Sequence, residues 1–265
     1  MVAVLAAVGV VAGFIDAIAG GGGLLTVPAL LSAGLDPVAA LATNKLQSSF
    51  GSFSAALTFA RAGKMNWREA APMAGASFAG AVAGASLIKA MPANLLAGIM
   101  PLLLIAVAIY FMASPRVSAE EGRARVSPRT FTFTVALGVG FYDGCFGPGT
   151  GSFFMIGFVS LLGLSIMRAV AHTKLLNFAS NIGALLFFAF TGGIHLIIGV
   201  AMGLGQYAGA RLGARMALRN GARIIRPLLV TVSCAMAARL LLDPANPLRN
   251  AVMSAIGTLF AAPSP

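Results

Sequence analysis

Two lysines, Lys45 and Lys174, lie in apolar stretches of the chain, each among a few polar side chains. These neighbours are Thr43, Asn44, Gln47 and Ser48 in the first case, and His172, Thr173 and Asn177 in the second. A compact ammonium charge with amide and hydroxyl groups around it suits a small oxyanion. The alternative is that each lysine sits at a helix end and extends its charge to lipid headgroups.

Two glycine-rich segments are the second feature that bears on chemistry. The first is formed by Gly20, Gly21, Gly22 and Gly23, and the second by Gly147, Gly149, Thr150 and Gly151 around Pro148. Each glycine costs a helix about 1 kcal/mol relative to alanine, so both segments predict a break. A helix that restarts after a break points free N–H groups at it, which favours an anion. The alternative is close packing of helices through small residues.

An aspartate precedes each glycine-rich segment, as Asp16 and Asp143. In a membrane such carboxylates often relay protons. Each could equally hold a lysine or cap a broken helix. His172 is a candidate pH-sensitive group, although a single histidine at a helix start is more often a structural hydrogen-bond donor.

Composition places the chain in a lipid bilayer. Hydrophobic residues make up 58% of the 265 and charged residues only 9%, whereas soluble domains carry about 25% charged residues. The net charge of +11 comes from scattered basic residues without interleaved aromatics, which argues against nucleic-acid binding. The sequence contains no motif of a hydrolase, nucleotide-binding enzyme or metal site, so we expect no enzyme activity, no cofactor and no metal.

Apolar segments long enough to span a bilayer organise the chain. Six run at about 44–62, 67–88, 95–112, 173–191, 194–216 and 224–242, and two longer, glycine-interrupted regions cover 2–33 and 131–163. We therefore predict an all-α polytopic membrane protein. Its predicted parts are a first transmembrane repeat (1–112), a cytoplasmic polar linker (113–130), a second transmembrane repeat (131–243) and a C-terminal tail (244–265).

The two predicted repeats resemble each other in sequence. Gly13-Phe14-Ile15-Asp16 aligns with Gly140-Phe141-Tyr142-Asp143, so that Gly23 aligns with Thr150. Further along, Thr43-Asn44-Lys45-Leu46 aligns with His172-Thr173-Lys174-Leu175, and the offset then stays constant. Internal symmetry with breaks at matching places is typical of secondary transporters.

The basic residues favour an inverted relation between the repeats. If each glycine-broken region is a hairpin that enters and leaves on one side, each half has three further transmembrane helices and the second half is inverted. Most basic residues then lie on one side of the membrane. Those on one side are then Arg61, Lys64, Arg68, Arg116, Arg123, Arg125, Arg129, Arg168, Arg215, Arg219, Arg223 and Arg226. Only Lys89 and Arg249 clearly fall opposite. Basic loops stay in the cytoplasm, so we expect both termini outside; if each broken region instead crosses once, the charges divide evenly.

The doubled pattern of Gly-Phe-x-Asp, a glycine-rich break and a later Asn/Thr-Lys-Leu element resembles the TauE/SafE family of sulfite-exporter-like proteins, over about Val8 to Leu242. Pro148 in the second break and Thr173 in place of Asn44 depart from the first half. The resemblance implies a multi-pass permease of the bacterial inner membrane that exports small sulfur-containing anions such as sulfite or organosulfonates. A channel-like anion pore and a carrier of an unrelated anion remain alternatives, and a homo-oligomer remains open.

Overall fold

The computed structural model describes residues 1–92, 95 and 122–220, and within these ranges the regular structure is entirely helical. The predicted segments at 95–112 (apart from Leu95) and 224–242 lie outside the described residues, as does the tail. The elements are α1 (Val2–Ala19), α2 (Gly23–Ser32), α3 (Pro37–Arg61), α4 (Trp67–Ala90), α6 (Pro128–Phe131), the π-helical turn η1 (Thr132–Ala136), α7 (Leu137–Cys145), α8 (Thr150–Leu162), α9 (Ile166–Thr191) and α10 (Leu196–Asn220). The prediction of an all-α polytopic membrane protein is confirmed.

Three of these helices, α1, α4 and α9, are long and apolar enough to cross a membrane by length and composition. The shorter apolar helices α2 and α8 are the second arms of the two glycine-broken regions. Both breaks predicted from the glycines are therefore present. The second helix restarts at Thr150, so Thr150 and Gly151 belong to α8 rather than to the break itself.

The helices that carry the two lysines begin earlier than the sequence predicted. Asp36 caps α3, because its Oδ1 accepts hydrogen bonds from the backbone N–H groups of Val38 and Ala39, each at 3.1 Å. Pro37 at the first helical position reinforces this start. In the same way α9 begins at Ile166, well before Lys174. The lysines therefore lie inside long helices, and the placement at helix ends was wrong.

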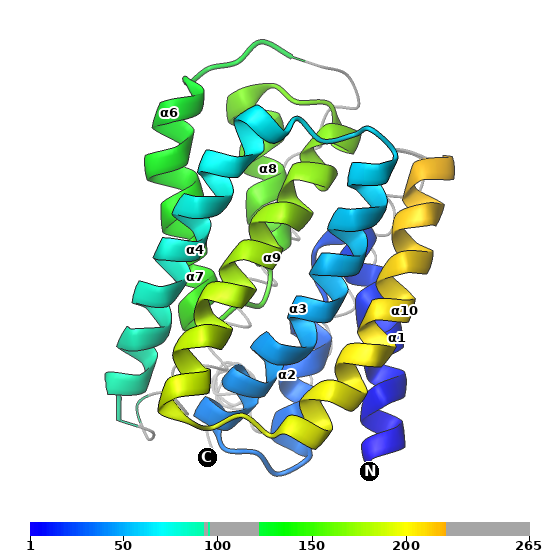
Figure 1. The fold of residues 1–265 in the computed structure, drawn as a ribbon, viewed down its shortest axis with the longest axis vertical. Coiled ribbons are helices and arrows are strands. Elements are labelled where there is room, and N and C mark those ends of the chain that lie inside the picture. The colour runs from blue at the N-terminus through cyan, green and yellow to red at the C-terminus, as the bar shows by residue number, and fades with distance from the viewer. Residues whose placement is uncertain (93–94, 96–121, 221–265) are drawn as a thin grey trace, which may run out of the picture.

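Figure 1 shows that the two broken hairpins open toward opposite ends of the bundle. The N-terminus and the α2–α3 connection lie at the lower end, whereas α6 and the α8–α9 connection lie at the upper end. Helix α3 runs upward and α9 runs downward. This arrangement has each broken region enter and leave on one side, as the hairpin interpretation of the charges expects. The repeat itself stays a prediction from the sequence.

Glycines let α1 pack closely on α10, and α7 on α4. A Cβ atom on Gly13 would lie 2.3 Å from the carbonyl oxygen of Gln206, and one on Gly209 would lie 1.9 Å from that of Val10. Between α4 and α7, a Cβ on Gly144 would lie 2.1 Å from the carbonyl oxygen of Ala81. Small residues at such crossings are typical of membrane helices. Each broken helix thus packs against a late helix of the other half.

The orientation in the membrane can be tested by cysteine labelling. The α3–α4 connection lies at the upper, basic end of the bundle and the α9–α10 connection at the lower end (Figure 1). Lys64 belongs to the first connection and His195 to the second, and both side chains are exposed. We expect a membrane-impermeant maleimide to label His195→Cys on intact cells, and Lys64→Cys only after permeabilisation, because basic loops stay inside. Cys145 and Cys234 are first replaced by serine. Labelling of both positions from the same side would contradict the fold, and the reverse pattern would contradict the charge argument.

Candidate functional site

The first helix break is shaped by glycines with unusual backbone angles. Gly20 ends α1 in the left-handed conformation (φ 83°), and its N–H bonds the carbonyl oxygen of Asp16 at 2.9 Å. In the second break, Gly147 and Gly149 have φ values of 91° and 84°. Only glycine adopts such angles without strain. The glycines therefore turn the chain back at the middle of each hairpin.

The two breaks lie against each other. A Cβ atom on Gly20 would be 2.6 Å from the carbonyl carbon of Gly151, and one on Gly23 would be 3.1 Å from the Cα of Pro148. The Ser152 hydroxyl donates a hydrogen bond of 2.7 Å to the carbonyl oxygen of Ala19. This gives a partner to one of the backbone carbonyl groups that the end of α1 leaves without a hydrogen bond within the helix. These glycines therefore bring backbone against backbone at the point where the two breaks meet.

Both lysines form buried ion pairs, and each pair joins the two halves of the chain. Lys45 on α3 lies 2.9 Å from Asp143 on α7, and Lys174 on α9 lies 2.9 Å from Asp16 on α1. Each ammonium group also donates to the backbone carbonyl oxygen of its aspartate. Because these carbonyls belong to the last turns of α1 and α7, the charges also face the negative ends of the helix dipoles. The lysines are 0% and 1% exposed, so they do not reach headgroups.

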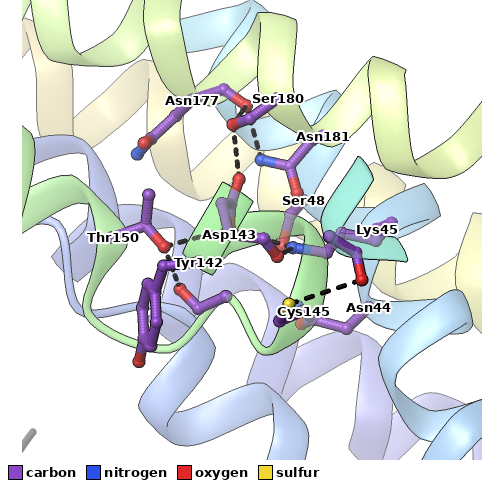
Figure 2. A network of polar contacts seen from close by, with 12 residues as sticks. Asn44, Lys45, Ser48, Tyr142, Asp143, Cys145, Thr150, Asn177, Ser180 and Asn181 are labelled. Atoms are coloured by element: carbon purple, nitrogen blue, oxygen red, sulfur yellow. Dashed lines mark hydrogen bonds and ion pairs between the residues drawn. The ribbon is translucent and has the colours of Figure 1, made fainter. Parts of the chain in front are cut away.

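Asp143 is surrounded by donors, as Figure 2 shows. Its Oδ1 accepts from Lys45 and, at 3.0 Å, from the hydroxyl of Thr150. Its Oδ2 accepts from the hydroxyl of Ser180. The side chain is 4% exposed. A buried carboxylate needs such partners to remain charged.

Asp16 has fewer partners. Its Oδ2 pairs with Lys174, and its Oδ1 accepts from the backbone N–H of Gly22 at 3.2 Å, which places it at the start of α2. Its side chain is 14% exposed. The sequence left open whether the aspartates relay protons, hold lysines or cap broken helices; both hold a lysine, and Asp16 also caps α2.

A small polar cavity of about 20 Å³ lies between the breaks. Such a volume is enough for about one water molecule. It is lined by Asp16, Gly20, Gly23, Asn44, Ser48, Ser52, Asp143, Gly147, Thr150, Gly151, Asn177 and Asn181. Carboxylates, amides and hydroxyls therefore face one another at the point where the two hairpins meet.

Other residues predicted for the site lie beside the cavity rather than on it. Thr43 accepts a hydrogen bond from the backbone N–H of His195 at 3.0 Å, and Gln47 donates to Asn44 at 2.7 Å. His172 and Thr173 are buried on α9 next to Lys174. Nδ1 of His172 lies 2.8 Å from the carbonyl oxygen of Arg168.

Several polar residues of the cavity were missed by sequence reasoning. Ser52 and Asn181 were not predicted, and Ser48 was noted only as a neighbour of Lys45. Ser180, which donates to Asp143 but does not line the cavity, was also missed. A signal for them exists, because Asn44, Ser48 and Ser52 recur every four residues and so share one face of α3. Asn177 and Asn181 have the same spacing on α9. Polar residues at that spacing in an apolar helix indicate a face turned to a polar interior.

Comparison with known proteins identifies the family of the chain. The family model described as "Sulfite exporter TauE/SafE" matches residues 5–240. The chain is 54% identical over 239 residues to the probable membrane transporter protein ORF9 of Sinorhizobium sp, covering 90% of this chain and 92% of that protein. It is 44% identical over 243 residues to the probable membrane transporter protein YfcA of Escherichia coli, covering 92% and 90%.

A probable membrane transporter protein of Haemophilus influenzae is 41% identical over 243 residues, covering 92% of this chain and 95% of that protein. No solved structure matches the chain significantly. The family match extends over both glycine breaks and both lysines. The chain therefore belongs to the TauE/SafE family of multi-pass membrane transporters.

Proposed function

We propose that the chain is a secondary transporter of the bacterial inner membrane that exports small sulfur-containing anions such as sulfite or organosulfonates. The observation that carries this proposal is the presence of two buried lysines, Lys45 and Lys174, at two helix breaks that meet in the interior. A buried ammonium group offsets the cost of dehydrating an anion. The breaks add backbone N–H groups and helix N-termini, which favour negative charge.

The polar residues around the breaks would complete the anion's coordination. Asn44, Asn177 and Thr150 line the cavity and offer amide and hydroxyl hydrogens to oxyanion oxygens. A sulfonate or sulfite presents three oxygens in one compact group. Several short side chains around one point can each donate to a different oxygen of such a group. The cavity must expand to hold such an anion, because its present volume is about 20 Å³.

A carrier fits this site better than a channel-like pore. The contact between Gly20 and Gly151 and the small cavity leave no room for an ion at the centre of the described residues. The two hairpins open toward opposite ends of the bundle, as an inverted repeat requires (Figure 1). Alternating access in transporters of this type moves such elements around a fixed central site.

The basic end of the bundle would collect the substrate. A cavity of about 390 Å³ lies there between the α3–α4 connection and the start of α9, and its lining includes Lys64 and Arg168. Clefts lined by positive charge raise the local concentration of anions. If this end faces the cytoplasm, as the charge asymmetry predicts, the cavity favours entry of the anion from inside the cell.

Binding and counterflow test the proposal. The purified protein is heated with sulfite, thiosulfate, sulfoacetate, taurine or sulfate, with chloride as the control. We expect at least one sulfur anion to raise the unfolding temperature, because a ligand at about a hundred times its Kd adds about 2.7 kcal/mol. In proteoliposomes preloaded with that anion, the labelled anion should enter by counterflow. Stabilisation by none of the five would contradict the proposed substrates, and uptake that neither saturates nor shows counterflow would favour the pore.

A further inference from the structure

The two lysine–aspartate pairs are not equivalent. Asp143 accepts from a lysine and from two hydroxyl groups, whereas Asp16 accepts from a lysine and from one backbone N–H. The Asp16 side chain is also more exposed, at 14% against 4%. Fewer hydrogen bonds hold Asp16 than Asp143, and its side chain is easier to reach, so the Lys174–Asp16 pair is the easier of the two to open.

The sequence explains this difference. In the alignment of the two halves, Thr150 corresponds to Gly23, and Ser180 corresponds to Gly51. The two residues that give hydroxyl groups to Asp143 are therefore replaced by glycines around Asp16. Glycine has no side chain, so neither Gly23 nor Gly51 can donate to the carboxylate of Asp16 in that way.

The lysines differ in the same direction. Within one helical turn of Lys174, three buried side-chain atoms have no hydrogen-bond partner among the described residues: His172 Nε2, Thr173 Oγ1 and Asn177 Oδ1. At the corresponding positions near Lys45, Thr43 accepts from a backbone N–H, and Asn44 Oδ1 accepts from Thr26 and Gln47. Buried polar atoms without partners are costly. The three unpartnered atoms can therefore form new hydrogen bonds beside Lys174. Near Lys45, one buried side-chain atom, Gln47 Oε1, is unpartnered in the same way.

We propose that Lys174 and Asp16 form the pair that opens during transport: the anion replaces Asp16 at the ammonium group of Lys174, and the displaced Asp16 carboxylate binds a proton. This inference rests on the proposed function, since it assumes an anionic substrate. Anion and proton then cross together, so export follows when the outward gradient of the anion exceeds the inward gradient of protons. The Lys45–Asp143 pair stays closed and holds the two hairpins together. One proton from water forms the O–H bond on Asp16, so the charge of the site is unchanged when a singly charged anion enters.

The groups that face Asp16 support a single proton acceptor. Lys174 is the charged group that faces Asp16 from α9, where the other titratable side chains are His172 and Arg168, the latter paired with Glu69. Asp143 with its bound Lys45 lies across the cavity, on α7 and α3. Helices α2 and α8 carry no titratable side chain. On α10, Arg211, Arg215 and Arg219 are exposed, and Tyr207 is half-buried. No second carboxylate of the described residues is therefore available to share the proton once Asp143 remains paired.

Transport of methanesulfonate tests the coupling, because this sulfonate stays ionised across the working pH range. In proteoliposomes with an acidic exterior, we expect the parent to accumulate methanesulfonate by about tenfold for each pH unit of the gradient. The Asp16→Asn variant, which imitates the protonated side chain, should retain counterflow but lose the accumulation driven by the pH gradient. Asp36→Asn, at an exposed carboxylate, should behave as the parent.

A measurement without any anion separates this inference from the proposed function. On acidification, infrared spectra of the parent should gain a carboxyl C=O band that is absent in Asp16→Asn and present in Asp36→Asn.

If Asp16→Asn does not reach the membrane, Lys174→Gln replaces it, and the same band is then expected already at neutral pH. An unchanged band in Asp16→Asn, or pH-driven accumulation that survives in it, would overturn the inference. The expected bands together with no transport of any sulfur anion by the parent would overturn the proposed function and leave Asp16 as a proton site.

Discussion

The Lys45→Gln variant is expected to unfold at a much lower temperature than the parent, with a loss of about 3–5 kcal/mol. Lys45 is fully buried, and its removal leaves the 4% exposed Asp143 without its ion-pair partner. Thr150 and Ser180 still donate to the carboxylate, but neither offers a charge. Thermal unfolding of the detergent-solubilised protein measures the effect.

Two further variants make this result specific to the buried pair. Lys45→Gln combined with Asp143→Asn replaces the ions by two amides and should recover most of the lost stability. Lys64→Gln removes an exposed lysine and should unfold with the parent. An equal unfolding temperature for Lys45→Gln and the parent would show that the pair does not hold the hairpins together.

Replacing Gly20 by alanine is expected to abolish transport and to destabilise the protein by about 2–5 kcal/mol. The left-handed backbone at this residue (φ 83°) costs a non-glycine residue about 1–2 kcal/mol. The new Cβ atom would also lie 2.6 Å from the backbone of Gly151, and overpacking of this kind costs about 1–3 kcal/mol. Thermal unfolding and anion counterflow measure the two consequences.

Gly138→Ala is the matched control for Gly20→Ala. Gly138 lies inside α7, and a Cβ atom there meets no other atom within 4 Å. Alanine is also the better helix former, by about 1 kcal/mol. This variant should therefore be as stable as the parent or slightly more stable. Equal stability of Gly20→Ala and Gly138→Ala would mean that the two breaks do not touch.

The helices and their breaks were predictable because length, apolarity and glycine act locally. Spans near 67–88 and 194–216 agree with α4 and α10 to within a few residues. The starts of α3 and α9 were misplaced because the polar residues around Lys45 and Lys174 resemble a helix end at a membrane surface. The capping signal of Asp36 and Pro37, which marks the true start of α3, lies farther upstream.

The partners within the site were not predictable from local patterns. Asp143 lies 98 positions from Lys45 in the sequence, and Asp16 lies 158 positions from Lys174. The alignment of the halves relates Lys45 to Lys174 and Asp16 to Asp143, but it does not say that each lysine pairs with the aspartate of the other half. That choice depends on how α1 and α7 pack against late helices of the opposite half.

The crossed pairing also constrains how the protein is made. Asp16 enters the bilayer with the first helix, while Lys174 is still 158 residues from being synthesised. At about 5–20 residues per second, this delay lasts roughly 8–32 s. During that time α1 also lacks α10, the helix against which its glycines pack. The first half is therefore incomplete when it enters the membrane. Until Lys174 has been synthesised, the Asp16 carboxylate needs another partner, either the insertion machinery or a bound proton.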